Sequence, residues 1–304
     1  MTNLKWFASF VLVLNLIPAI GAESGCPANS ECLPFRLVNR HQFIVPISVN
    51  QSGPFPFLLD TGSQYSMLDP SLEGALHLPL QGEAVVAGIG FNDSAPLARA
   101  ESIAAGSRSV RNSTLVVYDL QKLRPADLSV RGILGEDVLE QFDILIDNAH
   151  HVVCFGVPGS MGGEVKGNHV ELLVPEVGQN GVKLPESLIV SAKLTDGMRP
   201  VRLKLDSGTN TPFLYSASEV LALGAYRGAS WHGIGANGMQ RAFSALPAQD
   251  VRIGSVQLSK VGFITSTGTK RNAQTSNFDG LLAMGLFRRV FINHAEHYVV
   301  LDPW

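Results

Sequence analysis

The sequence predicts an all-β protein built from two copies of one barrel-like unit. Its 304 residues are enough for two domains of roughly 150 residues each. Four sequence blocks recur in the same order in the two halves, which indicates an internal repeat. Within each half, short apolar or alternating runs are separated by frequent turn signals, a pattern typical of small barrels.

The composition excludes several classes of protein. Hydrophobic residues make up 45% of the chain and charged residues only 16%, against about 25% charged residues in an average soluble protein. The 30 Gly and 17 Pro are too few for a collagen or a disordered chain. The formal net charge is −3 and no dense Lys/Arg stripe is visible, so we expect no nucleic-acid partner.

Residues 1–22 have the pattern of a secretory signal peptide. Lys5 precedes an apolar run over residues 6–20, and the small residues Gly21 and Ala22 suggest cleavage before Glu23. The run is shorter than the ~20 residues that a membrane span needs. We therefore expect an extracytoplasmic protein, secreted or periplasmic, with an N-terminal membrane anchor as the alternative.

The first unit is expected over residues 23–156. Strands are predicted at 44–50 and 55–59, joined by a tight turn rich in Gly and Pro. A short helix is expected at 136–142. A final hairpin follows, with its turn at 147–150.

The second unit repeats this order after a Gly-rich linker. The linker is expected at residues 157–170 and the C-terminal unit at 171–304. Strands are predicted at 188–194 and 201–205, a short helix at 284–289, and a closing hairpin at the end of the chain.

The repeat is visible in matched blocks of sequence. The first matched pair is the alternating run that begins at Ile44 and the one that begins at Ile189. The others are Phe57–Leu68 with Leu203–Leu214, Gly88–Asn92 with Gly233–Asn237, and Gly132–Phe155 with Gly280–Leu301. Their constant order and nearly constant offset indicate duplication of one domain.

Each copy carries one Asp-hydroxyl-Gly motif, at Asp60 and at Asp206. A single Asp-Thr-Gly is most often an ordinary turn. Two copies in a duplicated fold would meet across a pseudo-twofold axis. Two carboxyl groups that lie so close together share one proton. The ionised group can then accept a proton from water while the protonated group donates one to the substrate. This is general acid–base hydrolysis, for which we expect no metal and no cofactor.

Four segments together carry a family resemblance. They are Asp60-Thr61-Gly62-Ser63, Asp206-Ser207-Gly208-Thr209, Ile133-Leu134-Gly135 and Leu281-Leu282-Ala283. On these residues the sequence resembles aspartic proteases of the retropepsin and pepsin superfamily. The resemblance implies two pseudo-symmetric retropepsin-like β-barrel lobes with a catalytic cleft between them, a polypeptide substrate and activity as a monomer.

The resemblance also implies roles for individual residues. Asp60 and Asp206 would be the catalytic dyad. Thr61 and Ser207 would link the two loops through their hydroxyls, and Gly62 and Gly208 would let backbone approach the carboxylates. The segments Gly88-Ile89-Gly90 and Gly233-Ile234-Gly235 look like the flap hairpins of retroviral proteases, so the chain resembles a retropepsin homodimer fused into one polypeptide.

Ser63 and Thr209 follow the motifs where retroviral enzymes usually have Ala. A hydroxyl that hydrogen-bonds an ionised carboxylate lowers its pKa. We therefore expect an acidic optimum, roughly pH 3–5, by analogy with the pepsin dyad.

Ala283 departs from the family pattern, because the first half has Gly135 at the matching position. The family places this residue behind the catalytic loop. The departure keeps open one alternative, a catalytically inactive scaffold of the same fold that binds peptides.

The three cysteines leave one pairing open. Cys26 and Cys32 flank a short polar loop and are disulfide candidates, whereas Cys154 lies in an apolar run and is expected as a buried free thiol. No Cys or His spacing resembles a zinc site.

Two other enzyme classes fit the sequence less well. Residues 233–238 formally match the dinucleotide fingerprint GxGxxG, but the strand signal before them is weak and the first acidic residue after them, Asp250, comes too early. A glycosidase would also use two carboxylates, but it does not explain their matching Asp-hydroxyl-Gly context.

Overall fold

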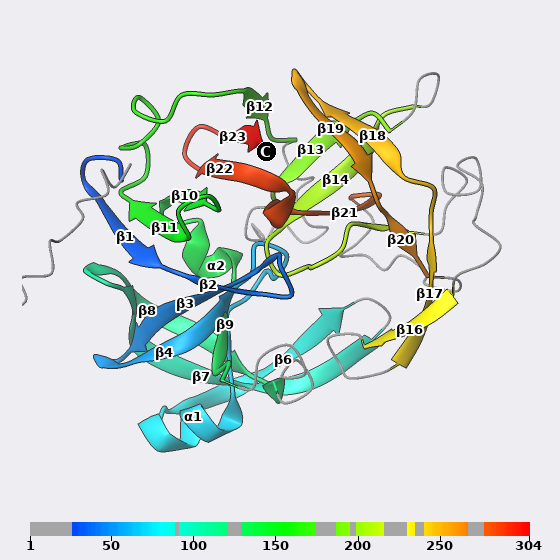
Figure 1. Cartoon of the computed structure of the whole chain (residues 1–304). Coiled ribbons are helices and arrows are strands. Elements are labelled where there is room, and N and C mark those ends of the chain that lie inside the picture. The colour runs from blue at the N-terminus through cyan, green and yellow to red at the C-terminus, as the bar shows by residue number, and fades with distance from the viewer. Residues whose placement is uncertain are drawn as a thin grey trace, which may run out of the picture.

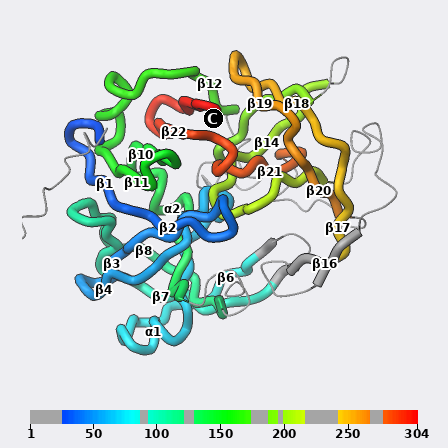
Figure 2. The backbone as a smooth tube through the Cα atoms, in the orientation of Figure 1, coloured from blue at the N-terminus to red at the C-terminus, as the bar shows by residue number. Residues whose placement is uncertain are grey.

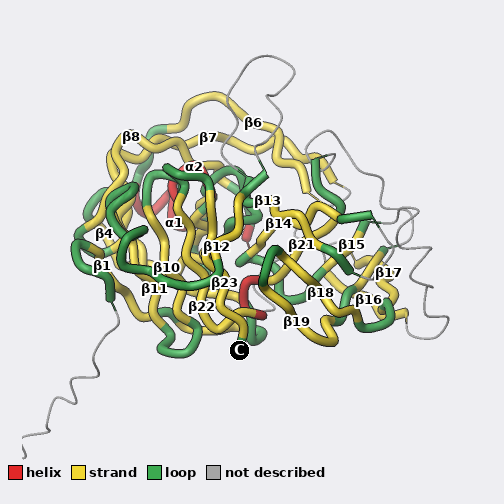
Figure 3. The backbone as a smooth tube through the Cα atoms, turned by 90° about the horizontal axis from the view of Figure 1, so that it is seen from above, coloured by secondary structure: helices red, strands yellow, loops and turns green. Residues whose placement is uncertain are grey.

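The fold is known from a computed structural model, which describes residues 26–88, 91–120, 129–173, 187–194, 199–215, 230–234, 240–266 and 277–304. The expected leader at residues 1–22 lies outside the described residues. No helix among the described residues is long and apolar enough to cross a membrane. Figure 3 shows that strands dominate the fold and that its helical segments are short.

The first half forms an eight-stranded sheet in the order β2-β3-β4-β9-β5-β8-β7-β6. Its strands are β2 (Arg36–Val38), β3 (Gln42–Val49), β4 (Ser52–Leu59), β5 (Met67–Leu68), β6 (Leu80–Gly88), β7 (Phe91–Ala105), β8 (Arg108–Val117) and β9 (Gly132–Leu134). The predicted first hairpin is confirmed, since Val49 pairs with Ser52 across its turn.

The second half forms a seven-stranded sheet in the order β13-β14-β21-β15-β20-β17-β16, beside a separate β18–β19 hairpin. The strands are β13 (Ile189–Ala192), β14 (Val201–Asp206), β15 (Phe213–Leu214), β16 (Ser230–Ile234), β17 (Gln240–Ala245), β18 (Gln249–Ile253), β19 (Val256–Val261), β20 (Ile264–Thr265) and β21 (Gly280–Ala283).

The two sheets share an unusual local topology. In the first, β4 runs parallel to β9, β5 is antiparallel to β9, and β5 is parallel to β8. The second sheet repeats these three relations in the same order. There β14 runs parallel to β21, β15 is antiparallel to β21, and β15 is parallel to β20. The repeat that is visible in the sequence is therefore also a repeat of strand pairing.

A six-stranded sheet joins the two halves, in the order β1-β11-β10-β22-β23-β12. Its strands are β1 (Ser30–Pro34), β10 (Asp143–Asp147), β11 (Val152–Gly156), β12 (His169–Glu171), β22 (Phe287–Asn293) and β23 (Tyr298–Pro303). The two predicted closing hairpins, β10–β11 and β22–β23, lie side by side because β10 pairs with β22 (Figures 1 and 2).

The helices are few and short. The expected helices at 136–142 and 284–289 are shorter in the structure, as α2 (Glu136–Leu139) and a 3-10 turn, η3 (Met284–Leu286). One helix was not predicted, α1 (Pro70–Leu76), which packs beside the first sheet (Figure 1). Its start signal was present, because Asp69 caps the helix and Pro70 occupies its first turn.

The apolar core runs through both halves, and its main cluster includes side chains from Phe35 to Leu301. The segment expected as a linker is also tied to the fold. Met161 and Val165 are buried against Phe291 of β22. The domain limits themselves stay a prediction.

The cysteine prediction was wrong. Cys32 is bonded to Cys154, and Cys26 is the free cysteine. The reason is tertiary, because β1 pairs with β11 and places Cys32 directly opposite Cys154 in the register. Sequence proximity suggested Cys26 as the partner of Cys32. The three sulfur atoms lie within 4.8 Å of one another, but the disulfide takes up two of them.

Candidate active site

Asp60 and Asp206 occupy equivalent places at the ends of equivalent strands. Asp60 follows β4 directly and Asp206 is the last residue of β14. The amides of Gly62 and Ser63 donate to Asp60 Oδ1 at 2.8 and 3.1 Å. In the second loop, the two amides that follow Ser207 donate to Asp206 Oδ1 at 2.8 and 3.0 Å. Each loop therefore fixes its own carboxylate in the same way.

The two loops face each other at very short range. A Cβ added to Gly62 would lie 2.5 Å from Cγ of Asp206, and one added to Gly208 would lie 2.3 Å from Cγ of Asp60. The two carboxyl groups are themselves hydrogen-bonded to each other. Glycine is thus required at both positions by close approach, as the resemblance implied.

The hydroxyls of Thr61 and Ser207 cross-link the loops, as expected. Thr61 Oγ1 donates to the carbonyl of Leu205 at 2.9 Å and accepts from the Ser207 amide at 3.0 Å. Ser207 Oγ donates to the carbonyl of Leu59 at 2.8 Å and accepts from the Thr61 amide at 3.0 Å. Both side chains are fully buried, so these four bonds join the halves in a dry environment.

The expectation for Ser63 and Thr209 was wrong. Their hydroxyls do not reach the carboxylates but donate to the carbonyls of Tyr65 and Thr211, at 2.8 and 3.0 Å. It is the backbone amides of these two residues that bond the carboxylates, and any residue except proline supplies an amide. The hydroxyls therefore give no reason for a low dyad pKa.

Burial and mutual repulsion control the proton affinity of the dyad. Burial, followed by the charge of Asp206, raises the pKa of Asp60 from 3.8 to about 7. Burial likewise raises the pKa of Asp206, and the largest opposing effect there comes from the Lys204 ammonium. Two carboxyls with raised pKa values in contact favour the state in which they share one proton.

Two side chains at the dyad were missed by the sequence analysis. Lys204 Nζ donates to the carbonyl of Gly62 at 2.7 Å, and Gln42 Nε2 donates to the carbonyl of Gly208 at 2.6 Å. Each comes from the opposite half of the chain. A signal for Lys204 was present, because it lies between two leucines, Leu203 and Leu205, in the strand that leads to Asp206.

The matched pair Gly135 and Ala283 differ for a local reason. A Cβ on Gly135 would lie 2.6 Å from the backbone carbon of Tyr65 and 2.9 Å from the amide nitrogen of Ser66. Ala283 is fully buried beside Asp206 in the β14–β21 register. The second half thus has room for the methyl group of Ala283, whereas in the first half the backbone of Tyr65 and Ser66 fills the space that a methyl group on Gly135 would need.

Polar groups behind the first loop brace it. Ser66 Oγ and its amide donate to Asp137 Oδ1 at 2.7 and 2.8 Å, and burial raises the pKa of Asp137 to about 6. The next residue back, Glu136, contacts His294 of the second half at 3.0 Å, and both are buried. His294 lies in the turn after β22 and is buried there, with Nδ1 3.0 Å from the carbonyl oxygen of Phe142.

The flap candidates lie on two hairpins in matching places. Gly88 pairs with Phe91 at the end of the β6–β7 hairpin, and Ile234 pairs with Gln240 in the β16–β17 hairpin. Gly233 lies within β16. The remaining flap candidates, Ile89, Gly90 and Gly235, lie outside the described residues.

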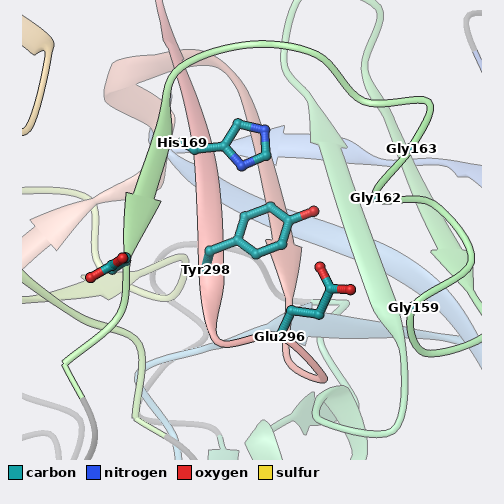
Figure 4. Close-up of a pocket in the computed structure, with 7 residues that line it drawn as sticks. Gly159, Gly162, Gly163, His169, Glu296 and Tyr298 are labelled. Atoms are coloured by element: carbon teal, nitrogen blue, oxygen red, sulfur yellow. The ribbon is translucent and has the colours of Figure 1, made fainter.

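Two hollows lie outside the dyad itself. One, of about 710 Å³, adjoins the first loop and is lined by Tyr65, Val85 and Asp137 among others. Tyr65 is exposed there. The other, of about 660 Å³, lies between the segment after β11 and the start of β23. In it the His169 ring stacks on Tyr298 at 4.7 Å (Figure 4).

Comparison with known protein families finds a match to the part of the chain that carries the first loop. Residues 45–138 match the sequence model of a family described as aspartyl protease, a retropepsin-like family. The match includes Asp60, its loop and Gly135. No curated protein matches the chain.

Proposed function

We propose that this chain, whose residues 45–138 carry the sequence pattern of retropepsin-like aspartyl proteases, is an aspartic endopeptidase with Asp60 and Asp206 as its dyad. One observation carries the proposal. Two equivalent loops present their carboxyls to each other, each carboxyl held by two amides and each loop tied to the other by buried hydroxyls. The geometry is that of a matched pair, which a structural turn does not need.

The proposed reaction needs only the two carboxyls and a water molecule. The ionised carboxylate removes a proton from the water as the oxygen attacks the peptide carbonyl. The protonated carboxyl donates to the carbonyl oxygen, which gives a tetrahedral intermediate without a covalent bond to the protein. Proton transfer to the departing amine then breaks the peptide bond. In each loop the amides bond only the Oδ1 atom of the aspartate. They therefore leave the Oδ2 atom free to exchange a proton with water or substrate.

The pH range follows from the shared proton. Activity requires one ionised and one protonated carboxyl. Because the pKa of Asp60 is raised to about 7, we expect activity to fall as the pH rises through about 7. The optimum of roughly pH 3–5 that we inferred by analogy with the pepsin dyad stays a prediction, and it now lacks support from the hydroxyls of Ser63 and Thr209.

The wider setting of the enzyme is part of the proposal. The signal pattern of residues 1–22 and the Cys32–Cys154 disulfide both fit an exported protein, since disulfides persist outside the reducing cytosol. The two halves would act as lobes around a cleft for an extended peptide. A chain that supplies both aspartates needs no second copy, so we expect an active monomer.

The test is cleavage of denatured casein by the mature protein across pH 2–8. We expect pepstatin-sensitive cleavage, abolished in Asp60→Asn and in Asp206→Asn, with both variants folded by circular dichroism. Peptide binding with no turnover at any pH would instead establish the alternative, a binding scaffold of the same fold.

A further inference from the structure

We propose that Lys204 is a positioning residue of the dyad, which holds the Asp60 loop from the opposite half and sets the pH range in which the two carboxyls share one proton. The enzymatic consequence rests on the proposed endopeptidase function. The electrostatic role does not, and it can be measured without turnover.

The position of Lys204 is unusual for a lysine. Lys204 is only 4% exposed, and lysines are almost never fully buried unless they are paired. Its ammonium bonds the carbonyl of Gly62 at 2.7 Å and lies 5.8 Å from the centre of the Phe278 ring. A neutral carbonyl and a ring face only partly offset the cost of burying a charge. The remaining favourable partner is the pair of carboxyls.

The charge acts on both halves of the dyad. Lys204 lowers the pKa of Asp60 and of Asp206, opposing the larger effect of burial in each case. Through Gly62 it also touches the loop whose glycine faces Asp206. One side chain therefore contacts the first loop while it stabilises negative charge on both aspartates.

The repeat shows that this charge is not required by the fold. Lys204 stands two residues before Asp206, and Leu58 stands two residues before Asp60. Leu58 is buried and packs in an apolar cluster. Gln42 gives the second loop the neutral equivalent of the Lys204 bond, because it donates to the carbonyl of Gly208. The fold thus accepts an apolar side chain at this strand position and a neutral donor at this carbonyl.

Other charged groups near the dyad do not replace Lys204. Among the described residues, Lys204 is the charge that acts on the pKa of both aspartates, and the charge of Asp206 acts in addition on the pKa of Asp60. The neighbouring elements also carry titratable groups, namely Arg202 on β14 itself, Asp279 directly before β21, Glu136 and Asp137 on α2, His294 after β22, and His41 beside η3. Arg202 is drawn toward Asp279, 3.9 Å away, and Glu136 contacts His294 at 3.0 Å.

The direction of the effect is fixed by charge. A cation favours the ionised form of a nearby carboxyl, so removing it raises both dyad pKa values. The pH range with one shared proton then moves upward at both ends. We expect a shift of about one pH unit in each limb of the activity profile.

The experiment compares pH profiles of kcat/KM for the full-length mature protein. Lys204→Gln removes the charge but keeps a donor for the carbonyl of Gly62, and Lys204→Arg keeps the charge. Leu58→Met is the matched control at the equivalent strand position. We expect both limbs to move up by about one unit in Lys204→Gln, and to stay in place in Lys204→Arg and Leu58→Met. A loss of rate that is equal at every pH would overturn the proposal, because it shows a purely structural role.

A second measurement separates this proposal from the proposed function. The carboxyl carbons of ¹³C-labelled aspartates, assigned with Asp60→Asn and Asp206→Asn, can be titrated by NMR in wild type and in Lys204→Gln. We expect the dyad midpoints to rise by about one pH unit in the variant, whether or not the protein cleaves peptides. Unchanged midpoints would overturn the proposal, and Lys204→Met serves in place of Lys204→Gln if that variant does not fold.

Discussion

Removing the Thr61 hydroxyl should destabilise the protein far more than the loss of one oxygen atom suggests. In Thr61→Val the side chain keeps its shape but loses both bonds of Oγ1, to the Leu205 carbonyl and from the Ser207 amide. Both bonds are buried. A buried polar group left without a partner costs about 1–3 kcal/mol. Two such groups should therefore lower the free energy of unfolding by about 2–5 kcal/mol.

The assay is urea unfolding followed by far-UV circular dichroism and tryptophan fluorescence, with coincident transitions as the test of two-state behaviour. Thr61→Ser is the control, because it keeps the hydroxyl and loses only a methyl group, for a cost of about 1 kcal/mol. Ser207→Ala should resemble Thr61→Val, since it orphans the Thr61 amide and the Leu59 carbonyl. If Thr61→Val unfolds within about 0.5 kcal/mol of wild type, the cross-link does not hold the halves together and the reasoning fails.

Three further predictions concern the dyad, the loop support and the disulfide. An acid whose pKa is higher in the folded state loses stability as the pH rises from the unfolded to the folded value. A rise from 3.8 to about 7 for Asp60 corresponds to about 4 kcal/mol at most, which we halve to about 2 kcal/mol because Asp60 keeps partial solvent contact. Between pH 4 and pH 8, the stability of Asp60→Asn in thermal unfolding should therefore rise by about 2 kcal/mol relative to that of wild type. A difference in stability between the two proteins that stays constant with pH would contradict this. Gly135→Ala should cost about 1–3 kcal/mol in urea unfolding, because its methyl meets backbone, whereas Ala283→Gly should cost only about 1 kcal/mol; equal losses would refute the contrast. Cys32→Ser opens a bridge between residues 122 apart and should cost about 2–5 kcal/mol, with Cys26→Ser as the neutral control. A Cys26→Ser variant as unstable as Cys32→Ser would count against the assigned pairing.

Much of the site could be predicted because its signals are local and occur twice. The Asp60 and Asp206 motifs follow apolar strands, and their repetition pointed to a pair. The roles of Thr61 and Ser207 came from the family resemblance, and the hydrogen bonds agree with them. The helix α1 could also have been predicted, since Asp69 and Pro70 are ordinary start signals.

Errors arose where the outcome depends on which groups meet in space. The hydroxyls of Ser63 and Thr209 lie close to the carboxylates in sequence, yet the loop turns them toward carbonyls. Cys26 is the nearest cysteine to Cys32 along the chain, but strand pairing places Cys154 opposite it. His294 does lie in a turn, but only the tertiary contacts bury it against Glu136.

The sequence by itself determined the all-β class and the two matching aspartate motifs, because strand patterns and repeated motifs are properties of the chain. Only the tertiary structure decided what surrounds those aspartates. The pairing of β10 with β22 joins the halves, and contacts across the two loops place Lys204 and Gln42 on the carbonyls of Gly62 and Gly208. The physical reason is that desolvation and charge interactions depend on distances between segments far apart in the chain. A motif can therefore identify the two aspartates, but only the assembled halves set their affinity for the proton.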